Sequence, residues 1–424
     1  MREEFLHFVW KNKKFKTKDL YTVSGDIISI VSLGQINYLA GPDFFNAKIE
    51  IAGQLWAGNV EIHLKSSDWY AHNHENDTNY NNVILHVVWE DDANVFRPDN
   101  TTIPCLELKD IVPLDLLDNH ASLMKSKKFI NCEKDFTSID NFTREHWLER
   151  LFVERLEQKS KLIFELLKAS KNDWEKVLFC VLMKNFGLNI NGPLFFDVAK
   201  TIDFTVFRKV KYDVIKSESL LFGMSNLLNG EAEDSYHKNL QEEFAFLSKK
   251  FRLQNNSLQK PNFYGLRPNN FPTIRLSQLA NVYKKSENLF LKVIETNELN
   301  EIKSIFEAAA SYYWDTHFVF GKNSRKSRKK LTSTFIELLI VNTILPIKFS
   351  YAKNIGESVP EHIINIARSL KPETNSIISK LENIGSKSMS AFDTQSKIQL
   401  FNSYCKENKC LKCSIGNKLL LDNS

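Results

Sequence analysis

The chain has 424 residues, of which 43% are hydrophobic and 25% are charged, and its formal net charge is +5. This composition is that of a globular protein and excludes a disordered chain, and the length predicts two or three domains. Six cysteines in so long a chain do not indicate a disulfide scaffold. The longest apolar run, 335–345, falls short of the about 18 residues that a membrane span needs, and the first residues lack the apolar stretch of a signal peptide. We therefore expect a folded, cytoplasmic protein with no membrane partner.

The first third of the chain is predicted to be rich in strands. A short amphipathic helix opens it, because Phe5, Phe8 and Val9 recur at the spacing of one helix face. Turn-forming residues then separate strand candidates at 26–32, 47–52, 55–64, 83–89 and 104–108. A polar stretch, 72–82, lies between the third and fourth of them. The predicted order is therefore helix, three strands, a short crossover and two strands, which indicates an α/β domain.

From about Thr143 onward the pattern becomes that of helices. Thr143 is a suitable N-cap, and Asn172 with Glu175 three residues later indicates a capping box for a helix that Gly187 ends. Further helices are predicted at 206–228, 236–249, 276–284, 301–310, 331–345 and 359–370. We expect an N-terminal domain, 1–110, a connecting segment, 111–142, and a mainly α-helical domain, 143–424.

The candidate catalytic residues lie between Gly41 and His86. Strand alternation places Glu61, His63 and Lys65 on one face, with apolar side chains on the other. If a two-residue turn at Gly53-Gln54 joins this strand to the preceding one, Asp43 falls opposite His63 and Leu64 and within roughly 10 Å of Glu61. A bulge at Gly58 could shift this register by one residue. Two carboxylates at that spacing can hold Mg²⁺ or Mn²⁺, and a neighbouring cation or imidazole can position or deprotonate the attacking water.

This pattern resembles the PD-(D/E)XK nuclease superfamily, whose core is a helix, three strands, a helix and a strand. Pro42-Asp43 stands where that superfamily has its first motif, and Glu61-Ile62-His63 where it has its second. The resemblance covers about the first 110 residues. It implies a mixed sheet and metal-dependent cleavage of phosphodiester bonds, with Asp43 and Glu61 as metal ligands. The chain departs from the superfamily at His63, which stands in place of a lysine, so Lys65 or Lys48 is a further candidate for the third catalytic group.

A solvated sheet face and a routine Pro-Asp turn would give the same short motif without any site. The histidines of the region favour a site, because His72, His74 and Asp77 follow the strand and His86 lies on the next one. These residues could extend the metal site, contact a phosphate or form a separate transition-metal site. His86 has apolar neighbours and is the one most readily interpreted as a core histidine.

A second candidate metal site lies at the C-terminus, in the pattern Cys405-x4-Cys410-x2-Cys413. Its polar surroundings make Cys132 the expected fourth ligand, whereas Cys180 has the surroundings of a buried small hydrophobe and Cys105 could serve either way. Four thiolates suit zinc or a [4Fe–4S] cluster, and the alternative is unliganded thiols in a tail. The arrangement is similar to that of the iron–sulfur nucleases of the same superfamily, in which the lone cysteine precedes the nuclease motifs, whereas Cys132 follows them.

Two basic features indicate contacts with nucleic acid. Arg267 and Arg275 flank a loop with two prolines that leads into a helix, which is typical either of a phosphate site or of a rigid connection. The run 322–330 has six cations in nine residues, including Arg325, Arg328 and Lys329, and fits a loop on a nucleic-acid backbone or a merely solvated loop.

The Gly-Pro-Asp-Phe, Val-Glu-Ile-His and Arg-Pro-x-Asn-Phe-Pro segments, together with the terminal cysteines, resemble an uncharacterised bacterial domain-of-unknown-function family. That resemblance implies no activity. From the site we expect a metal-dependent nuclease that cleaves DNA. The alternatives are a non-catalytic nucleic-acid-binding or scaffolding protein on a degenerate nuclease fold, and a hydrolase that binds zinc through its histidines.

Overall fold

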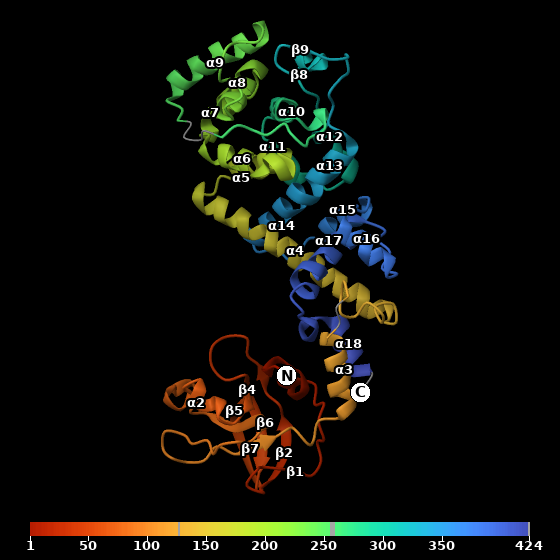
Figure 1. Cartoon of the computed structure of the whole chain (residues 1–424). Helices are drawn as coiled ribbons and strands as arrows, with labels where there is room; N and C mark the ends of the chain where they lie inside the picture. The colour runs from red at the N-terminus through yellow and green to blue at the C-terminus, as the bar shows by residue number, and fades with distance from the viewer. Residues whose placement is uncertain (126–127, 255–258, 423–424) are drawn as a thin grey trace. The chain divides into compact units, whose positions relative to one another are not determined.

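The computed structural model describes residues 1–125, 128–254 and 259–422. The chain forms two compact units, of which the first comprises Met1–Trp147, Asn383–Ser386 and Leu400–Ser424, and the second Leu148–Glu382 and Lys387–Gln399 (Figure 1). The first unit contains a mixed sheet of seven strands, and the second is mostly helical. The predicted order, a mixed-sheet region followed by a mainly helical part, is therefore confirmed.

The division between the units falls close to the boundary expected near Thr143. The connecting segment, 111–142, lies with the first unit. The C-terminal segment Leu400–Ser424, which the sequence analysis assigned to the helical domain, also belongs to the first unit. The first unit is thus built from both ends of the chain.

The elements of the first unit include the opening helix and all five strands expected from the sequence, with ends within three residues of the expected ones. The very short strands β1 and β3 escaped prediction because two residues show no periodicity. In chain order the unit has α1 (Glu3–Lys11), β1 (Leu20–Tyr21), β2 (Ile27–Ser32), β3 (Gln35–Ile36), β4 (Phe44–Ile51), β5 (Gln54–Lys65), α2 (Asp68–Ala71), the 3₁₀ turns η1 (His74–Asn76) and η2 (Thr78–Tyr80), β6 (Val83–Glu90), β7 (Cys105–Glu107), α3 (Leu114–Lys125), the π-helical turn η6 (Phe401–Cys405), the 3₁₀ turn η7 (Cys410–Lys412) and α18 (Ser414–Asp422).

The strands follow the spatial order β1-β2-β4-β5-β6-β7, with β3 paired to β4. Neighbours from β1 to β5 are antiparallel, whereas β5 and β6, and β6 and β7, are parallel. A parallel pair needs a crossover connection rather than a tight turn. The segment with α2, η1 and η2 makes this crossover between β5 and β6, and it carries the histidines described below.

The turn between β4 and β5 lies at Ala52-Gly53, one residue before the expected Gly53-Gln54. Ile51 pairs with Gln54, and the two turn residues have φ of +50° and +79°. Positive φ at both central residues is the requirement of a type I′ turn, whose twist matches that of the strands.

A β-bulge in β4 shifts the hairpin register further. It lies between Phe44 and Ala47, where Asn46 has φ of +57°, and not at Gly58, where the sequence analysis had considered a bulge. Phe44 therefore pairs with Val60. As a result Asp43 lies beside Glu61 rather than opposite His63.

The core of the first unit lies between α1 and one face of the sheet. Phe5, Leu6 and Val9 of α1 are fully buried and belong to the same hydrophobic cluster as Val60 and Ile62 of β5. Because strand residues alternate, Glu61 and His63 face the other side of β5. Leu420 of α18 also belongs to this cluster, and Figure 1 shows α18 beside α3.

The second unit is a helical bundle around one large hydrophobic cluster. Asp173, rather than the expected Asn172, caps its second helix by accepting a hydrogen bond from the backbone N–H of Lys176. The single helix expected at 206–228 is two helices, because Asp213 caps a new helix in the middle of that range. The elements are α4 (Asn141–Ala169), α5 (Trp174–Phe186), α6 (Leu188–Thr201), α7 (Phe204–Val210), α8 (Val214–Met224), α9 (Ser235–Phe251), η3 (Pro268–Asn270), α10 (Pro272–Lys284), α11 (Leu289–Glu295), α12 (Leu299–Ile305), η4 (Tyr312–Asp315), β8 (His317–Val319), β9 (Lys322–Asn323), α13 (Ser333–Leu339), η5 (Ile340–Ile344), α14 (Leu345–Asn354), α15 (Glu361–Ser369), α16 (Ser376–Asn383) and α17 (Ala391–Leu400).

α13, the π-helical η5 and α14 form one continuous helical stretch, Ser333–Asn354. In the described part of the chain, this stretch alone is long and apolar enough to cross a membrane. However, 78% of its most apolar window is buried inside the protein, which is the environment of a core helix.

Candidate metal centre

Glu61 and His63 are buried at the centre of the first unit. They leave only 5% and 1% of their surface exposed, although the sequence pattern had indicated a solvated polar face. The crossover segment with α2, η1 and η2 accounts for the difference, because its His72 and His74 lie against these side chains.

Asp43 is held next to Glu61 by two backbone hydrogen bonds. The backbone N–H of Asp43 donates to Glu61 Oε2 at 3.1 Å, and the backbone N–H of Ile62 donates to Asp43 Oδ2 at 3.0 Å. Each carboxylate is thus fixed by the main chain of the other strand. The two candidate carboxylates therefore converge, as the sequence analysis expected.

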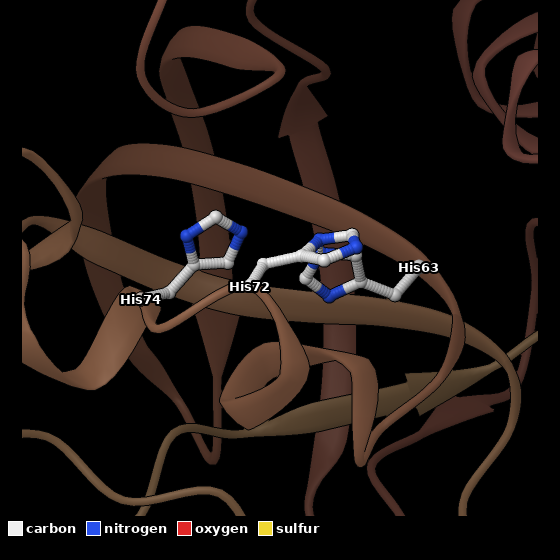
Figure 2. A group of neighbouring side chains, drawn as sticks. All are labelled: His63, His72 and His74. Carbon is white, nitrogen blue, oxygen red and sulfur yellow. Dashed lines mark hydrogen bonds between the residues drawn. The ribbon is translucent and has the colours of Figure 1, made fainter.

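Glu61 Oε1 lies among the ring nitrogens of several histidines. It is 3.4 Å from His63 Nε2 and 3.3 Å from His74 Nε2, and His63 Nε2 is 3.1 Å from His72 Nδ1. The three histidines offer nitrogens that all lie within 4.8 Å of one another, and Figure 2 shows the three rings gathered together. We call Glu61, His63, His72 and His74 the histidine–carboxylate cluster.

These separations are those of ligands around one metal ion. Metal–ligand bonds of about 2.1 Å place neighbouring ligand atoms about 3.0 Å apart in an octahedron and about 3.4 Å apart in a tetrahedron. The distances of 3.1, 3.3 and 3.4 Å span this interval, and the nitrogens of the three histidines all lie within 4.8 Å of one another. His72 is exposed and His74 half-buried, so the cluster is accessible from solvent on that side.

His86 contacts the ring nitrogen of His63 that does not face Glu61, and so fixes the orientation of the His63 ring. His63 Nδ1 and His86 Nε2 are 2.8 Å apart, and both rings are buried on the neighbouring strands β5 and β6. If His63 Nδ1–H donates to His86, the lone pair of His63 Nε2 is left for a cation, which is the usual arrangement of a metal-binding histidine. His86 is therefore a core histidine, as its apolar neighbours indicated, and it also supports the cluster.

Aromatic rings hold the remaining imidazoles in place. The His74 ring stacks on Tyr80 with 3.8 Å between the ring centroids, and Trp69 packs edge-on against both His74 and His86. Trp69 and Tyr80 belong to a small hydrophobic cluster of the crossover segment. The crossover is thus anchored by its own apolar residues, and it presents the histidines to β5.

Burial shifts the protonation of the cluster toward neutral groups. Burial, followed by the neighbouring histidines, lowers the pKa of His63 to about 2, and burial lowers the pKa of His86 to about 3. Burial, followed by the Asp43 carboxylate, raises the pKa of Glu61 to about 9. Neutral imidazoles are ready to bind a cation, whereas Glu61 must first lose a proton.

His7 of α1 is a functional candidate that the sequence analysis missed. Its Nε2 lies 3.1 Å from Asp43 Oδ2. Burial opposes the charged form, but the hydrogen bond to Asp43 and the charges of Asp43, Glu3 and Glu61 raise the pKa of His7 above its ordinary value. The signal in the sequence was His7, one turn after Glu3 and set among the apolar residues of the opening helix.

Lys65, Lys48 and Asp77 lie outside the cluster. Lys65 is exposed and forms an ion pair with Asp92. Lys48 is exposed and pairs with Ala57, four residues before Glu61 on β5. Asp77 caps η2 by accepting a hydrogen bond from the backbone N–H of Asn79.

The four cysteines proposed as a second site lie together in the first unit. Burial, followed by the nearby thiols of Cys413 and Cys410, raises the pKa of Cys132 to about 12. Burial, followed by Cys413, Cys132 and Cys410, raises the pKa of Cys405 as well. Cys105 interacts with Asp91 and Glu107 instead, and Cys180 is buried in the helical core.

The arginines of the proline loop differ in their surroundings. Arg267 is exposed at the start of η3. Arg275 is buried: its guanidinium lies 3.5 Å from the centroid of the Phe335 ring and donates hydrogen bonds to Gln278 and Asn270. Arg275 thus packs within the helical unit and does not present its charge to solvent.

The basic run also separates into engaged and exposed side chains. Lys329 is buried and donates hydrogen bonds to the backbone oxygens of Asp315 and Ser327. Arg328 forms an ion pair with the Asp315 carboxylate, whereas Arg325 is exposed. The spacing in sequence therefore overstates the free positive charge of this loop.

The protein thus has an α/β unit, whose mixed β-sheet carries the histidine–carboxylate cluster, and a second unit that is mostly helical. The chain belongs to the family described as "Protein of unknown function (DUF2851)", whose profile it matches over residues 3–376. The match includes the whole cluster and Cys132 and ends before Cys405. Comparisons with curated proteins and with solved structures found no significant match. The expected membership of an uncharacterised family is confirmed.

Proposed function

We propose that this protein is a metal-dependent hydrolase that cleaves phosphodiester bonds of nucleic acid, with DNA as the expected substrate. The observation that carries the proposal is the geometry of the histidine–carboxylate cluster: Glu61 Oε1 lies 3.4 Å from His63 Nε2 and 3.3 Å from His74 Nε2, and the nitrogens of His63, His72 and His74 lie within 4.8 Å of one another. Asp43, fixed beside Glu61, completes a site in which a hydrolytic water can be bound and deprotonated.

The donor atoms favour a transition metal over magnesium. Imidazole nitrogens suit Zn²⁺, Fe²⁺ and similar ions, whereas Mg²⁺ prefers oxygen ligands and keeps several waters. Three histidines and one carboxylate thus support Mn²⁺ or Zn²⁺ at this site. Such an ion would act as a Lewis acid on a phosphoryl oxygen and lower the pKa of a bound water.

The pair of His7 and Asp43 supplies the group that the missing lysine would provide. Asp43 holds His7 Nε2, and the raised pKa of His7 favours the imidazolium, a cation that can stabilise negative charge on the phosphate or the leaving oxygen. We therefore assign metal binding to the histidine–carboxylate cluster and charge stabilisation to His7, which Asp43 positions.

The order of elements supports a relationship to the PD-(D/E)XK nucleases. α1, β2, β4 and β5 are followed by the crossover with α2 and by β6 parallel to β5, which is the helix, three strands, helix and strand of that core. Asp43 precedes the second of these strands and Glu61 lies on the third, as the motif implies. Exposed Arg267 and Arg325 are the candidate contacts to the nucleic-acid backbone.

The test is a cleavage assay with metal-free full-length protein, reloaded separately with Mn²⁺, Zn²⁺ or Mg²⁺, on single- and double-stranded DNA and on RNA. We expect cleavage of DNA with Mn²⁺ or Zn²⁺. Glu61→Gln should lower the cleavage rate by at least about 100-fold, because removing a direct metal ligand costs more than removing a residue that only hydrogen-bonds a ligand. Glu50→Gln on β4 is the matched control and should cleave like the parent.

Lys48→Ala and Lys65→Ala separate this proposal from a lysine-dependent one. Both lysines lie outside the cluster, so each variant should retain activity within a few-fold, whereas His7→Ala should lose most of it. Loss of activity in a lysine variant but not in His7→Ala would contradict the assignment of His7. If the protein binds metal and nucleic acid tightly but cleaves with none of the metals, it is better explained as a non-catalytic nucleic-acid-binding protein. The histidine at position 63, in place of a lysine, is the reason to consider that alternative.

A further inference from the structure

Four of the six cysteines form a group in the first unit that is separate from the histidine–carboxylate cluster. Cys132 lies after α3, and Cys405, Cys410 and Cys413 lie just before α18. Asn131, next to Cys132, donates a hydrogen bond to Cys410 Sγ, and the Phe129 ring stacks on the Phe401 ring with 4.6 Å between the centroids, so the segment of Cys132 lies against the segment of the other three. The electrostatic interactions of the Cys132 and Cys405 thiols with Cys410 and Cys413 agree with this placement. We propose that these cysteines ligate one thiolate-bound metal centre, which fastens the C-terminal segment Leu400–Ser424 to the sheet unit.

Two of these sulfurs accept hydrogen bonds that favour a thiolate, although burial outweighs these bonds and raises the pKa of Cys410 and Cys413. The backbone N–H groups of Ile415 and Gly416, in the first turn of α18, donate to Cys413 Sγ. Asn131 Nδ2 donates to Cys410 Sγ at 3.5 Å. Donors aimed at sulfur, with a helix N-terminus among them, stabilise a thiolate and are typical of metal-binding cysteines.

The backbone of Cys410 lies very close to the first turn of α18. A Cβ at Gly416 would lie 2.3 Å from the carbonyl oxygen of Cys410, so only glycine fits there. Cys132, Cys410 and Cys413 are buried, with 9%, 9% and 6% of their surface exposed. Thiols buried in this way stay neutral, and a bound metal cation would supply the charge that lets them become thiolate ligands.

The spacing of the sulfurs favours an iron–sulfur cluster over a single zinc ion. Among the described residues, only His63, His72 and His74 bring three ligand atoms within 4.8 Å of one another. No three cysteine sulfurs of the described chain are that close together, whereas bonds of 2.3 Å place the sulfurs of a zinc tetrathiolate about 3.8 Å apart. A [4Fe–4S] cluster spreads its four thiolates over separate iron atoms and so accepts sulfurs that lie more than 4.8 Å apart.

The position of the centre explains what it would do. The chain leaves the first unit after Trp147, touches it again at Asn383–Ser386 and returns to it finally at Leu400. Cys132 lies before Trp147, and the other three cysteines lie after Leu400. Bonds from all four to one metal centre would therefore connect the N-terminal and C-terminal segments of the first unit. The other links of the segment include an exposed ion pair between Lys412 and Glu4, a kind of contact that contributes little by itself.

The experiment is metal and sulfide analysis of the full-length protein purified without oxygen, combined with X-ray absorption at the edge of the metal found. We expect about four iron and four sulfide per chain and sulfur neighbours at about 2.3 Å. The double variant Cys410→Ala/Cys413→Ala should lose this metal and the hydrogen-exchange protection of 400–422. Cys105→Ala is the matched control and should keep both.

A separate variant distinguishes this centre from the proposed hydrolytic site. His63→Ala should lose metal with nitrogen and oxygen neighbours and keep the sulfur-bound metal. About one zinc per chain with sulfur neighbours would support a metal centre at the four cysteines but overturn its assignment as a [4Fe–4S] cluster. Folded protein without sulfur-bound metal, or with sulfur-bound metal that survives in the double variant, would overturn the proposal.

Discussion

At the scale of single residues, the position of one proton decides how the site is prepared for a metal. Glu61 is buried beside Asp43, and the pair holds a proton near neutral pH because burial and the second carboxylate raise the pKa of Glu61 to about 9. The imidazoles of His63 and His86 are neutral in the same range, since burial lowers their pKa values. The metal-free site is thus largely uncharged, which lowers the cost of burying it.

We predict that metal binding releases about one proton, and that it comes from this carboxylate pair. Below about pH 9 a bound cation must displace the proton, so the affinity for Mn²⁺ should rise about tenfold per pH unit between pH 6.5 and 8. Calorimetric titration in buffers of different ionisation enthalpy measures the proton directly. Glu61→Gln should release none, and an affinity independent of pH in the parent would contradict the protonated pair.

At the scale of elements, the site depends on how closely β5 and β6 approach. Glu61 pairs with His86 across the parallel strands, and His63 pairs with Val88. Gly58 permits this approach, because a Cβ there would lie 2.4 Å from Ile84 Cγ2 and 2.5 Å from the backbone oxygen of Asn82. The second of these contacts is with backbone, which cannot move aside like the end of a side chain.

Gly58→Ala should therefore destabilise the first unit by about 1–3 kcal/mol, the usual cost of overpacking, and weaken metal binding through the displaced His86. Urea unfolding followed by the fluorescence of the first unit measures the stability. Ala57→Ser changes the exposed neighbour on the same strand and should have no effect. Equal stability of Gly58→Ala and the parent would show that the strands can separate without cost.

At the scale of the whole molecule, the first unit is closed by residues from both ends of the chain. Leu420 of α18 is 1% exposed and packs in the cluster that also contains Phe5 and Ile62. Lys14 Nζ donates to the backbone oxygen of Leu421, which adds a polar link between the same parts. The sheet that carries the site thus relies on residues that come last in the sequence.

Leu420→Ala should lower the stability of the first unit by about 2–5 kcal/mol, as expected for a buried leucine. Hydrogen exchange resolved by peptide measures each unit separately, and we expect faster exchange in β4 and β5 with unchanged exchange in the second unit. Lys418→Ala alters a half-buried residue of the same helix, whose ion pair with Asp422 is a surface contact that contributes little, and should leave both unchanged. Faster exchange throughout the chain would contradict the independence of the two units.

Part of the candidate site could be predicted from local pattern. Asp43, Glu61 and His63 follow from a short motif and from strand alternation, which depends only on neighbouring residues. His72 and His74 were visible as a dense group of histidines but had no defined role. His7 could not be found in this way, because its contact with Asp43 joins α1 to β4 through the tertiary structure.

The register shows the limit of the same reasoning. Counting from an assumed turn placed Asp43 opposite His63, but an earlier turn and a bulge at Asn46 bring it beside Glu61 instead. Turn type and bulge position depend on how the whole sheet twists and pairs, so a count along the chain misses them.

The sequence by itself determined the elements of this protein, the order of sheet and helices, its family, and the identity of most candidate ligands, because these depend on local periodicity and residue type. The tertiary structure decided which of those residues meet. It buried the face of β5 that looked solvated, excluded Lys48 and Lys65 from the cluster, and internalised Arg275 and Lys329. It also returned Leu400–Ser424 to the first unit. Burial and distance between residues far apart in sequence arise from the packing of the complete chain, which no local pattern encodes.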